Sequence, residues 1–235
     1  MQSLIAAFKY LTVWGRINTL QPAPVAIGAG AIYFPLVGIS LGFLLAILNF
    51  GLSAYLDSQI LSIFLVATLL IATGGVPIDG IRQTVEAFHL DPSRTPSSRE
   101  KISGLVTIIF MIMFKVSAID VLDDTLTMSL LLTPALGRWA LVIFIYGYHD
   151  RCEETPRRIA ENVRFWHLLV TTLATLGLAV YLVGRKGLWI GLSLSALALS
   201  ARSLLHRHHA VLTVGNFGAV IELSETLSLI LLASL

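Results

Sequence analysis

The sequence is poor in charged residues, and this shortage excludes an ordinary water-soluble globule. Only 13% of the 235 residues are charged, whereas a soluble domain carries about a quarter of its residues as charges. A strongly basic face is also lacking, because the net charge is +2 and the positive residues are spread over short segments, so we expect no nucleic-acid partner. The single cysteine, Cys152, excludes a disulfide framework and any CxxC metal or redox motif.

Apolar residues are abundant instead, at 56% of the chain with a mean hydropathy of +0.82. They fall in long blocks, as in membrane helices, and not in the short alternations of a β-barrel. We predict an all-α, polytopic membrane protein with one domain over residues 1–235. About seven transmembrane helices are expected, with six or eight as alternatives, in the blocks 27–56, 60–76, 102–122, 126–148, 167–183, 188–205 and 217–235.

Lysine and arginine residues orient the chain, because basic loops stay on the cytoplasmic side. With seven spans, one face receives Lys9, Arg16, Arg82, Arg94, Arg99, Lys101, Arg151, Arg157, Arg158, Arg164, Arg202 and Arg207. We therefore expect an inner-membrane protein with its N-terminus inside, an interfacial segment at 1–26, and cytoplasmic loops at 77–101 and 149–166. The histidine-rich run at 206–209 is interpreted as a solvated turn rather than a metal site.

Several ionisable residues lie inside or next to the apolar blocks, where each costs a few kcal/mol unless it is paired or faces a wet cavity. They are Asp79, Lys115, Arg138, Glu222 and Glu225. A purely structural role stays open for each of these residues. Asp79 would cap a helix, Lys115 would reach a lipid headgroup, Arg138 would clamp helices together, and the two glutamates would hold Arg138 in a salt bridge.

The alternative is a phosphoryl-transfer site built from these groups. If a helix starts near Asp79, then Asp79, Gln83 and Glu86 share one helix face, because they follow the i, i+4, i+7 pattern. Such oxygen ligands suit Mg²⁺, which takes one or two carboxylates together with substrate phosphates. Lys115 and Arg138 would then neutralise phosphate oxygens or pair with the carboxylates.

An ordered set of motifs resembles the cobalamin synthase family, whose members are adenosylcobinamide-GDP ribazoletransferases of the late cobalamin pathway. The pieces are FKYLTVWGRI, YFPLVGISLG, TGGVPIDG, the intramembrane Lys115, the GRW that contains Arg138, and VGNFGAVIELSE. Together they run along almost the whole chain, so the family's multi-pass membrane fold is expected here.

The departures from the family fall on its acidic signature, which is close to H-x-D-G-x-A-D-x-x-D-G. Asp79 and Gly80 are kept. The chain differs at Pro77, Arg82, Gln83, Glu86 and Ala87, and Asn216 stands where the family has aspartate near the end. Loss of negative charge at positions 83 and 216 weakens a Mg²⁺ site, because affinity for hard cations follows ligand charge.

The resemblance implies that α-ribazole or its 5′-phosphate is joined to adenosylcobinamide-GDP with release of GMP. It implies Mg²⁺ held by Asp79, Gln83 and Glu86, with Lys115 and Arg138 facing the diphosphate. The substrate-binding set further includes Gly80, Asn216, Glu222 and Glu225. The implied partners are these small molecules, membrane lipid and other proteins of the cobalamin pathway.

Two rival functions stay open. A diverged paralogue would keep the fold but bind a corrinoid intermediate or partner proteins without turnover, which the altered signature favours. The second rival function is a small transporter, in which the buried charges would form the permeation path. The sequence has no paired, interrupted half-repeats to support this function.

Overall fold

A computed structural model describes residues 2–17, 22–88, 98–122, 125–148, 151–207 and 211–234 of the chain. In these ranges every regular element is a helix, which confirms the predicted all-α class. The helices are α1 (Gln2–Leu11), α2 (Trp14–Ile17), α3 (Pro24–Ala29), the 3₁₀ turn η1 (Ala31–Tyr33), α4 (Phe34–Leu52), α5 (Ser58–Ala72), α6 (Val76–Phe88), α7 (Ser98–Asp120), α8 (Leu126–Ile145), α9 (Glu154–Glu161), α10 (Phe165–Val183), α11 (Arg185–Arg207) and α12 (Val214–Ser234).

Six of the described helices are long and apolar enough to cross a membrane, and the bent pair α5 and α6 makes a seventh if it is counted as one span. The expected count of about seven is thereby confirmed. The block 27–56 is not one continuous helix, because the chain breaks at Gly30 and starts again in α4, where Pro35 lies in the first turn. Proline is tolerated there, because the N–H groups in the first turn of a helix have no intrahelical carbonyl partner. The N–H that proline lacks therefore costs no hydrogen bond.

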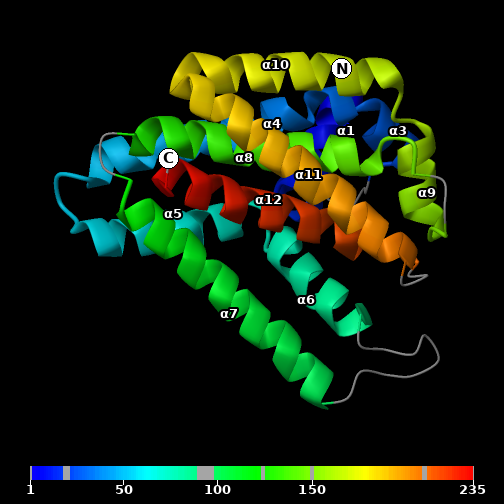
Figure 1. The fold of residues 1–235 in the computed structure, drawn as a ribbon, viewed down its shortest axis with the longest axis horizontal. Helices are drawn as coiled ribbons and strands as arrows, with labels where there is room; N and C mark the ends of the chain where they lie inside the picture. Colours follow the sequence, from blue (N-terminus) through cyan, green and yellow to red (C-terminus); the bar gives the residue numbers. More distant parts are fainter. Residues whose placement is uncertain are drawn as a thin grey trace.

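Helices α8 and α12 form the centre of the bundle, and the other spans surround them (Figure 1). In the most apolar 18-residue stretch of each helix, the share buried inside the protein is 83% in α8 and 67% in α12. The corresponding share is 17% in α10 and 22% in α7. The outer helices therefore turn apolar side chains outward, as in a protein surrounded by lipid. The charged residues of these two helices, Arg138, Glu222 and Glu225, are correspondingly buried in protein.

Glycines let α4 approach α8 so closely that the two backbones touch. A Cβ added at Gly38 would lie 2.4 Å from the carbonyl oxygen of Pro134, and one at Gly42 would lie 2.6 Å from that of Leu130. Small residues at helix contacts are the usual means of close packing in membranes, where burial from water gives no driving force. This contact fixes α8, which carries Arg138.

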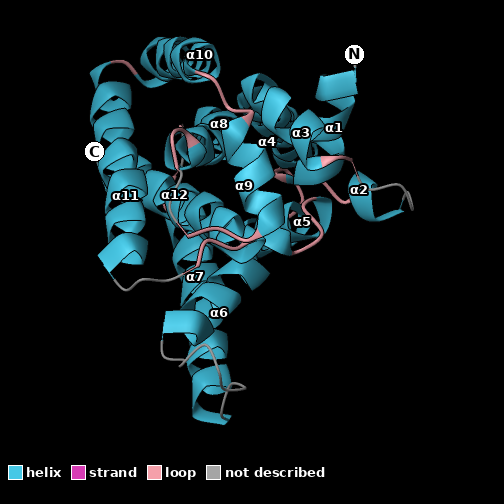
Figure 2. Ribbon diagram, turned by 90° about the vertical axis from the view of Figure 1, so that its right-hand side faces the viewer, coloured by secondary structure: helices cyan, strands magenta, loops and turns pink. Residues whose placement is uncertain are grey.

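The chain turns by 82° between α5 and α6. Gly74 and Gly75 stand at the turn with φ of 64° and 68°, values that L side chains rarely adopt. As a result α6 and the amino-terminal part of α7 extend away from the main body of helices (Figure 2). The segment 77–101 was expected to be a loop. Instead residues up to Phe88 belong to helix α6, and residues from Ser98 belong to helix α7.

The second expected loop, 149–166, likewise contains a helix, α9. A short parallel bridge joins this region to the start of α12. The N–H of Leu212 donates to the carbonyl of Arg151 at 2.8 Å, and the N–H of Glu153 donates to the carbonyl of Leu212 at 3.0 Å. The beginning of α12 is therefore held in place from outside the membrane-spanning bundle.

The α4–α8 contact predicts a difference between two glycines of one helix. Gly38→Ala should lower the thermal midpoint in detergent by several degrees, because overpacking a tight contact costs about 1–3 kcal/mol. Gly51→Ala is the matched control, since nothing lies within 4 Å of a Cβ there and alanine favours helix. Equal melting of the two variants would contradict the close approach of α4 to α8.

Candidate functional site

Helix α6 carries a polar face made of Asp79, Arg82, Gln83 and Glu86. Arg82 lies between the two carboxylates. Its Nε donates to Asp79 Oδ1 at 2.8 Å and its Nη1 to Glu86 Oε1 at 2.9 Å. The Gln83 Nε2 amide donates to Asp79 Oδ2 at 2.7 Å. The predicted face is therefore present, because the helix begins before Asp79, but its acids are bound to a cation from the same helix.

Helix α6 packs against the first turns of α12 through glycine. A Cβ added at Gly80 would lie 2.4 Å from the carbonyl oxygen of Gly215 and 2.9 Å from Gly218 Cα, so only glycine fits at position 80 without movement. Asn216 Nδ2 donates to Thr84 Oγ1 at 3.0 Å, which ties the two helices together. Gly80 and Asn216, both expected near substrate, lie buried in this helix contact.

Four charged side chains from three helices meet in the protein interior. Lys115 of α7 lies 2.7 Å from Glu222 Oε1 and 2.7 Å from Glu225 Oε2, both on α12. Glu225 also accepts a hydrogen bond from Arg138 of α8. We call these four residues, Lys115, Arg138, Glu222 and Glu225, the buried charge cluster. Two cations balance two carboxylates, so the cluster is neutral as a whole, which is the condition for burying charge at acceptable cost.

Arg138 is the least exposed member of the buried charge cluster, at 0%. Its Nη1 also donates to the carbonyl oxygen of Pro134 at 3.2 Å. Gly137 makes room for Glu225, since a Cβ there would lie 2.8 Å from Glu225 Cγ. Among the described residues the Nε and Nη2 groups of Arg138 have no hydrogen-bond partner. The guanidinium therefore keeps two donors for a water molecule or an anion oxygen.

The predicted site residues thus form two groups at different heights along α12. Asp79, Gln83 and Glu86 lie on α6, where Gln83 lies against Gly215 of α12, whereas the glutamates of the buried charge cluster begin at Glu222. Seven residues of helix separate these points, or about 10 Å along the axis. One helix therefore touches both groups, but no ion pair joins them in the part of the chain that the structure describes.

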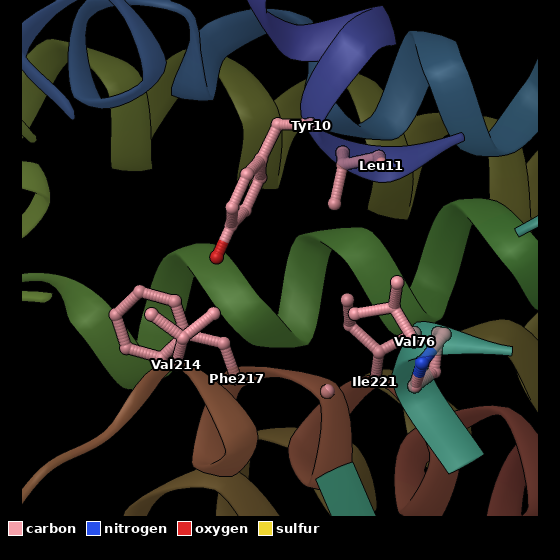
Figure 3. A pocket seen from close by; sticks show the side chains of 8 residues that line it. Tyr10, Leu11, Val76, Val214, Phe217 and Ile221 are labelled. Carbon is pink, nitrogen blue, oxygen red and sulfur yellow. The ribbon is translucent and has the colours of Figure 1, made fainter. Parts of the chain in front are cut away.

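A small pocket lies where α1, α6 and α12 meet, and the hydroxyl of Tyr10 points from α1 toward α12 (Figure 3). The lining residues are Tyr10, Leu11, Val76, Pro77, Val214, Phe217, Gly218 and Ile221. The cavity has a volume of about 20 Å³, which is room for a water molecule and far too little for a nucleotide. This pocket therefore does not hold the substrate, whereas the polar face of α6 has Asp79 45% exposed.

Three structural alternatives raised by the sequence can now be judged. Asp79 is not the cap of α6, because the helix begins at Val76 and the N–H of Asp79 already donates to the carbonyl of Gly75 at 3.0 Å. Lys115 does not extend toward a headgroup, since it is 1% exposed and bound by both glutamates. The salt bridge to Arg138 is present, and it comes from Glu225. Part of the histidine run, His208 and His209, lies outside the described residues.

The α6 face does not suit a divalent cation held jointly by Asp79, Gln83 and Glu86. Arg82 already pairs with both carboxylates, and Gln83 turns its NH₂ group toward Asp79, where a metal ligand would present oxygen. In the described residues no group of three His, Cys, Asp or Glu side chains is arranged to hold a metal. The expectation of Mg²⁺ stays a prediction that needs its own experiment.

The pairing of Arg82 with the acids of this face was not predicted, although the spacing of these residues in the sequence indicates it. Asp79, Arg82 and Glu86 stand at i, i+3 and i+7, the spacing at which opposite charges pair on one side of a helix. The contribution of Gly104 was also missed. This glycine of α7 leaves room for Arg82, since a Cβ there would lie 2.8 Å from Arg82 Cγ.

Comparison with known proteins shows what the chain is similar to. The sequence model of a family described as cobalamin-5-phosphate synthase matches residues 3–233. A protein named adenosylcobinamide-GDP ribazoletransferase from Stutzerimonas stutzeri is 31% identical over 99% of this chain and 98% of its own length. Proteins with the same name from Alkaliphilus metalliredigens and Pseudomonas fluorescens are 26% and 29% identical over 96% and 88% of this chain, and 92% and 88% of their own lengths. No solved structure matches.

The buried charge cluster predicts an unequal effect of its two glutamates on stability. Glu225→Gln should lower the free energy of unfolding by about 3 kcal/mol or more, because two buried cations lose a charged partner. Glu222→Gln should cost less, since Glu222 pairs with Lys115 alone. Thermal melting in detergent measures both.

Glu154→Gln is the control for this comparison, because Glu154 forms an exposed pair with Arg158 that is worth at most about 1 kcal/mol. A Glu225→Gln variant that melts like this control would show that Glu225 does not hold the three helices together.

Proposed function

The chain belongs to the cobalamin-5-phosphate synthase family, and from this premise we propose that it joins adenosylcobinamide-GDP to α-ribazole or its 5′-phosphate. The match covers nearly the whole chain, and relatives that bear the transferase name align with it end to end. The apolar helices make the chain a multi-pass membrane protein. We further propose the inner membrane, an inside N-terminus, and contacts with lipid and other proteins of the pathway.

The proposed reaction is a displacement at phosphorus. A hydroxyl oxygen of α-ribazole forms a bond to the phosphorus on the cobinamide side of the diphosphate, and the bond from that phosphorus to the bridging oxygen breaks. GMP leaves with the bridging oxygen, and the proton lost from the hydroxyl balances the charge that GMP gains. Positioning and charge neutralisation carry most of the catalysis in such transfers.

We place the reacting groups at the polar face of α6. The observation that carries this proposal is exposure: the side chain of Asp79 is 45% exposed, whereas the acids of the buried charge cluster are each 2% exposed. A polar substrate reaches Asp79 from the surface without opening the bundle. In this scheme Asp79 accepts a hydrogen bond from the attacking hydroxyl and orients it.

The buried charge cluster has a supporting role in the proposal. Lys115 is engaged by both glutamates, so it holds α7 against α12. Arg138 has two unpartnered donors among the described residues, which supports its use as the group that faces a phosphate oxygen. Its complete burial means that a diphosphate would meet it only after movement of the surrounding side chains.

A second candidate function is supported by one observation. Arg82 engages both carboxylates of the α6 face. This face therefore has less free negative charge than a transfer site that works through a divalent cation requires. A paralogue that binds a corrinoid intermediate or a partner protein without turnover would tolerate this arrangement. Release of GMP separates the two functions.

Purified protein in liposomes, supplied with adenosylcobinamide-GDP and α-ribazole phosphate, should release GMP, measured by chromatography of the soluble products. The assay is run with and without added Mg²⁺. Asp79→Asn should slow this release by on the order of a hundredfold, because misplacing a reacting group costs about that much.

Asp57→Asn is the matched control for the transfer assay. Asp57 is exposed, lies in the turn between α4 and α5, and makes no side-chain cap with α5. The control should release GMP at the unaltered rate. Binding of the corrinoid substrate by the unaltered protein without any GMP release would reject the transferase and favour the second candidate.

A further inference from the structure

Arg82 is bound on every nitrogen of its guanidinium. Nε and Nη2 each lie 2.8 Å from Asp79 Oδ1, and Nη1 lies 2.9 Å and 3.0 Å from the two carboxylate oxygens of Glu86. The side chain therefore spans from one acid to the other. A guanidinium carries five N–H groups, and these contacts engage four of them, so its main partner is the pair of acids.

Both oxygens of each carboxylate on this face already accept hydrogen bonds. Asp79 Oδ1 accepts from Arg82 and Asp79 Oδ2 accepts from the Gln83 amide, while both oxygens of Glu86 accept from Arg82. These are the oxygens that a divalent cation would need as ligands. A cation entering between them would have to displace Arg82 or lie beside its positive charge, and both are unfavourable.

Neighbouring helices fix this arrangement. On one side, Gly104 of α7 leaves the room that Arg82 fills, since a Cβ there would also lie 3.2 Å from Glu86 Oε1. On the other side, a Cβ at Gly215 of α12 would lie 2.6 Å from Gln83 Oε1. The oxygen end of the Gln83 amide thus faces α12 and the nitrogen end faces Asp79, which is the wrong way round for metal binding.

An ion from solution reaches this face from the side of Asp79. The side chain of Asp79 is 45% exposed and that of Arg82 is 33% exposed, whereas that of Glu86 is 9% exposed. The limit is charge: two carboxylates and one guanidinium leave a net charge of −1 on this face. Affinity for hard cations rises with the charge of the ligand set, and this set is weak.

We propose that the guanidinium of Arg82 takes the position between Asp79 and Glu86 that a divalent cation would occupy, so that the chain supplies its own cation there. The inference deepens the proposed function, on which it rests for the identity of the site. Arg82 is then a positioning residue that holds Asp79 and Glu86 in one orientation, and the face needs no metal ion to be ordered.

Titration with Mn²⁺ tests the proposal without any assay of activity. Mn²⁺ prefers the same oxygen ligands as Mg²⁺, and its free form is measured by electron paramagnetic resonance. The full chain in detergent should bind no Mn²⁺ through Asp79 and Glu86. Arg82→Met removes the charge and keeps an unbranched side chain in the space beside Gly104, so this variant should bind at least tenfold more tightly than the unaltered protein.

Two further variants separate charge from packing. Arg82→Lys keeps a cation between the acids and should bind Mn²⁺ no better than the unaltered protein. Arg158→Met, in the exposed pair with Glu154 on α9, is the matched control for loss of one arginine from a helix pair and should show no gain. Mn²⁺ should also raise the melting temperature of Arg82→Met, because a ligand that binds only the folded state stabilises it.

The outcomes are decisive in both directions. Tight Mn²⁺ binding by the unaltered protein that is lost in Asp79→Asn would overturn the proposal, because the acids would then accept a metal beside Arg82. Failure of Arg82→Met to gain a site would overturn it as well. Neither result depends on GMP release. An inactive protein therefore rejects the proposed function alone, whereas Mn²⁺ binding through Asp79 in the unaltered protein, or no gain in Arg82→Met, rejects the cation role of Arg82 alone.

Discussion

The contact of Glu225 with two cations is the interaction on which the arrangement of the central helices depends. Its two carboxylate oxygens engage Lys115 of α7 and Arg138 of α8, so one side chain of α12 joins three membrane helices. In the protein interior, loss of one partner leaves an uncompensated charge, so removal of any one of these charges is strongly destabilising. Because α12 also carries the surface against which α6 packs, the buried charge cluster sets the place of the polar face as well.

Close approach of backbones complements this ionic contact. Gly80 and Gly215 bring α6 onto α12, and Gly104 brings α7 onto the other side of α6. Helix α6 is therefore held between two helices. The room left by Gly104 and Gly215 is taken up by the side chains of Arg82 and Gln83, which both pair with Asp79 of the same helix. The same device, on a larger scale, joins α4 to α8 at Gly38.

Much of this could be predicted from sequence, because membrane spans and intramembrane charges give strong local signals. The shared face of Asp79, Gln83 and Glu86 follows from helical spacing alone. The pairing of Lys115 with the carboxylates was one of two alternatives that the sequence left open, because the choice between them depends on how distant helices pack. The bend after α5 was missed because the glycines at 74 and 75 were read as the end of a span, and the turn conformation that positions α6 has no periodicity to reveal it.

The link between Asn216 and Thr84 joins residues 132 positions apart in the chain. Helix α6 is therefore synthesised long before α12, and the close contact of Gly80 with Gly215 and Gly218 forms only once α12 is in place. Packing of α6 against α12 must wait for late synthesis, whereas the ion pairs of Arg82 with Asp79 and Glu86 lie within α6 and need no later helix.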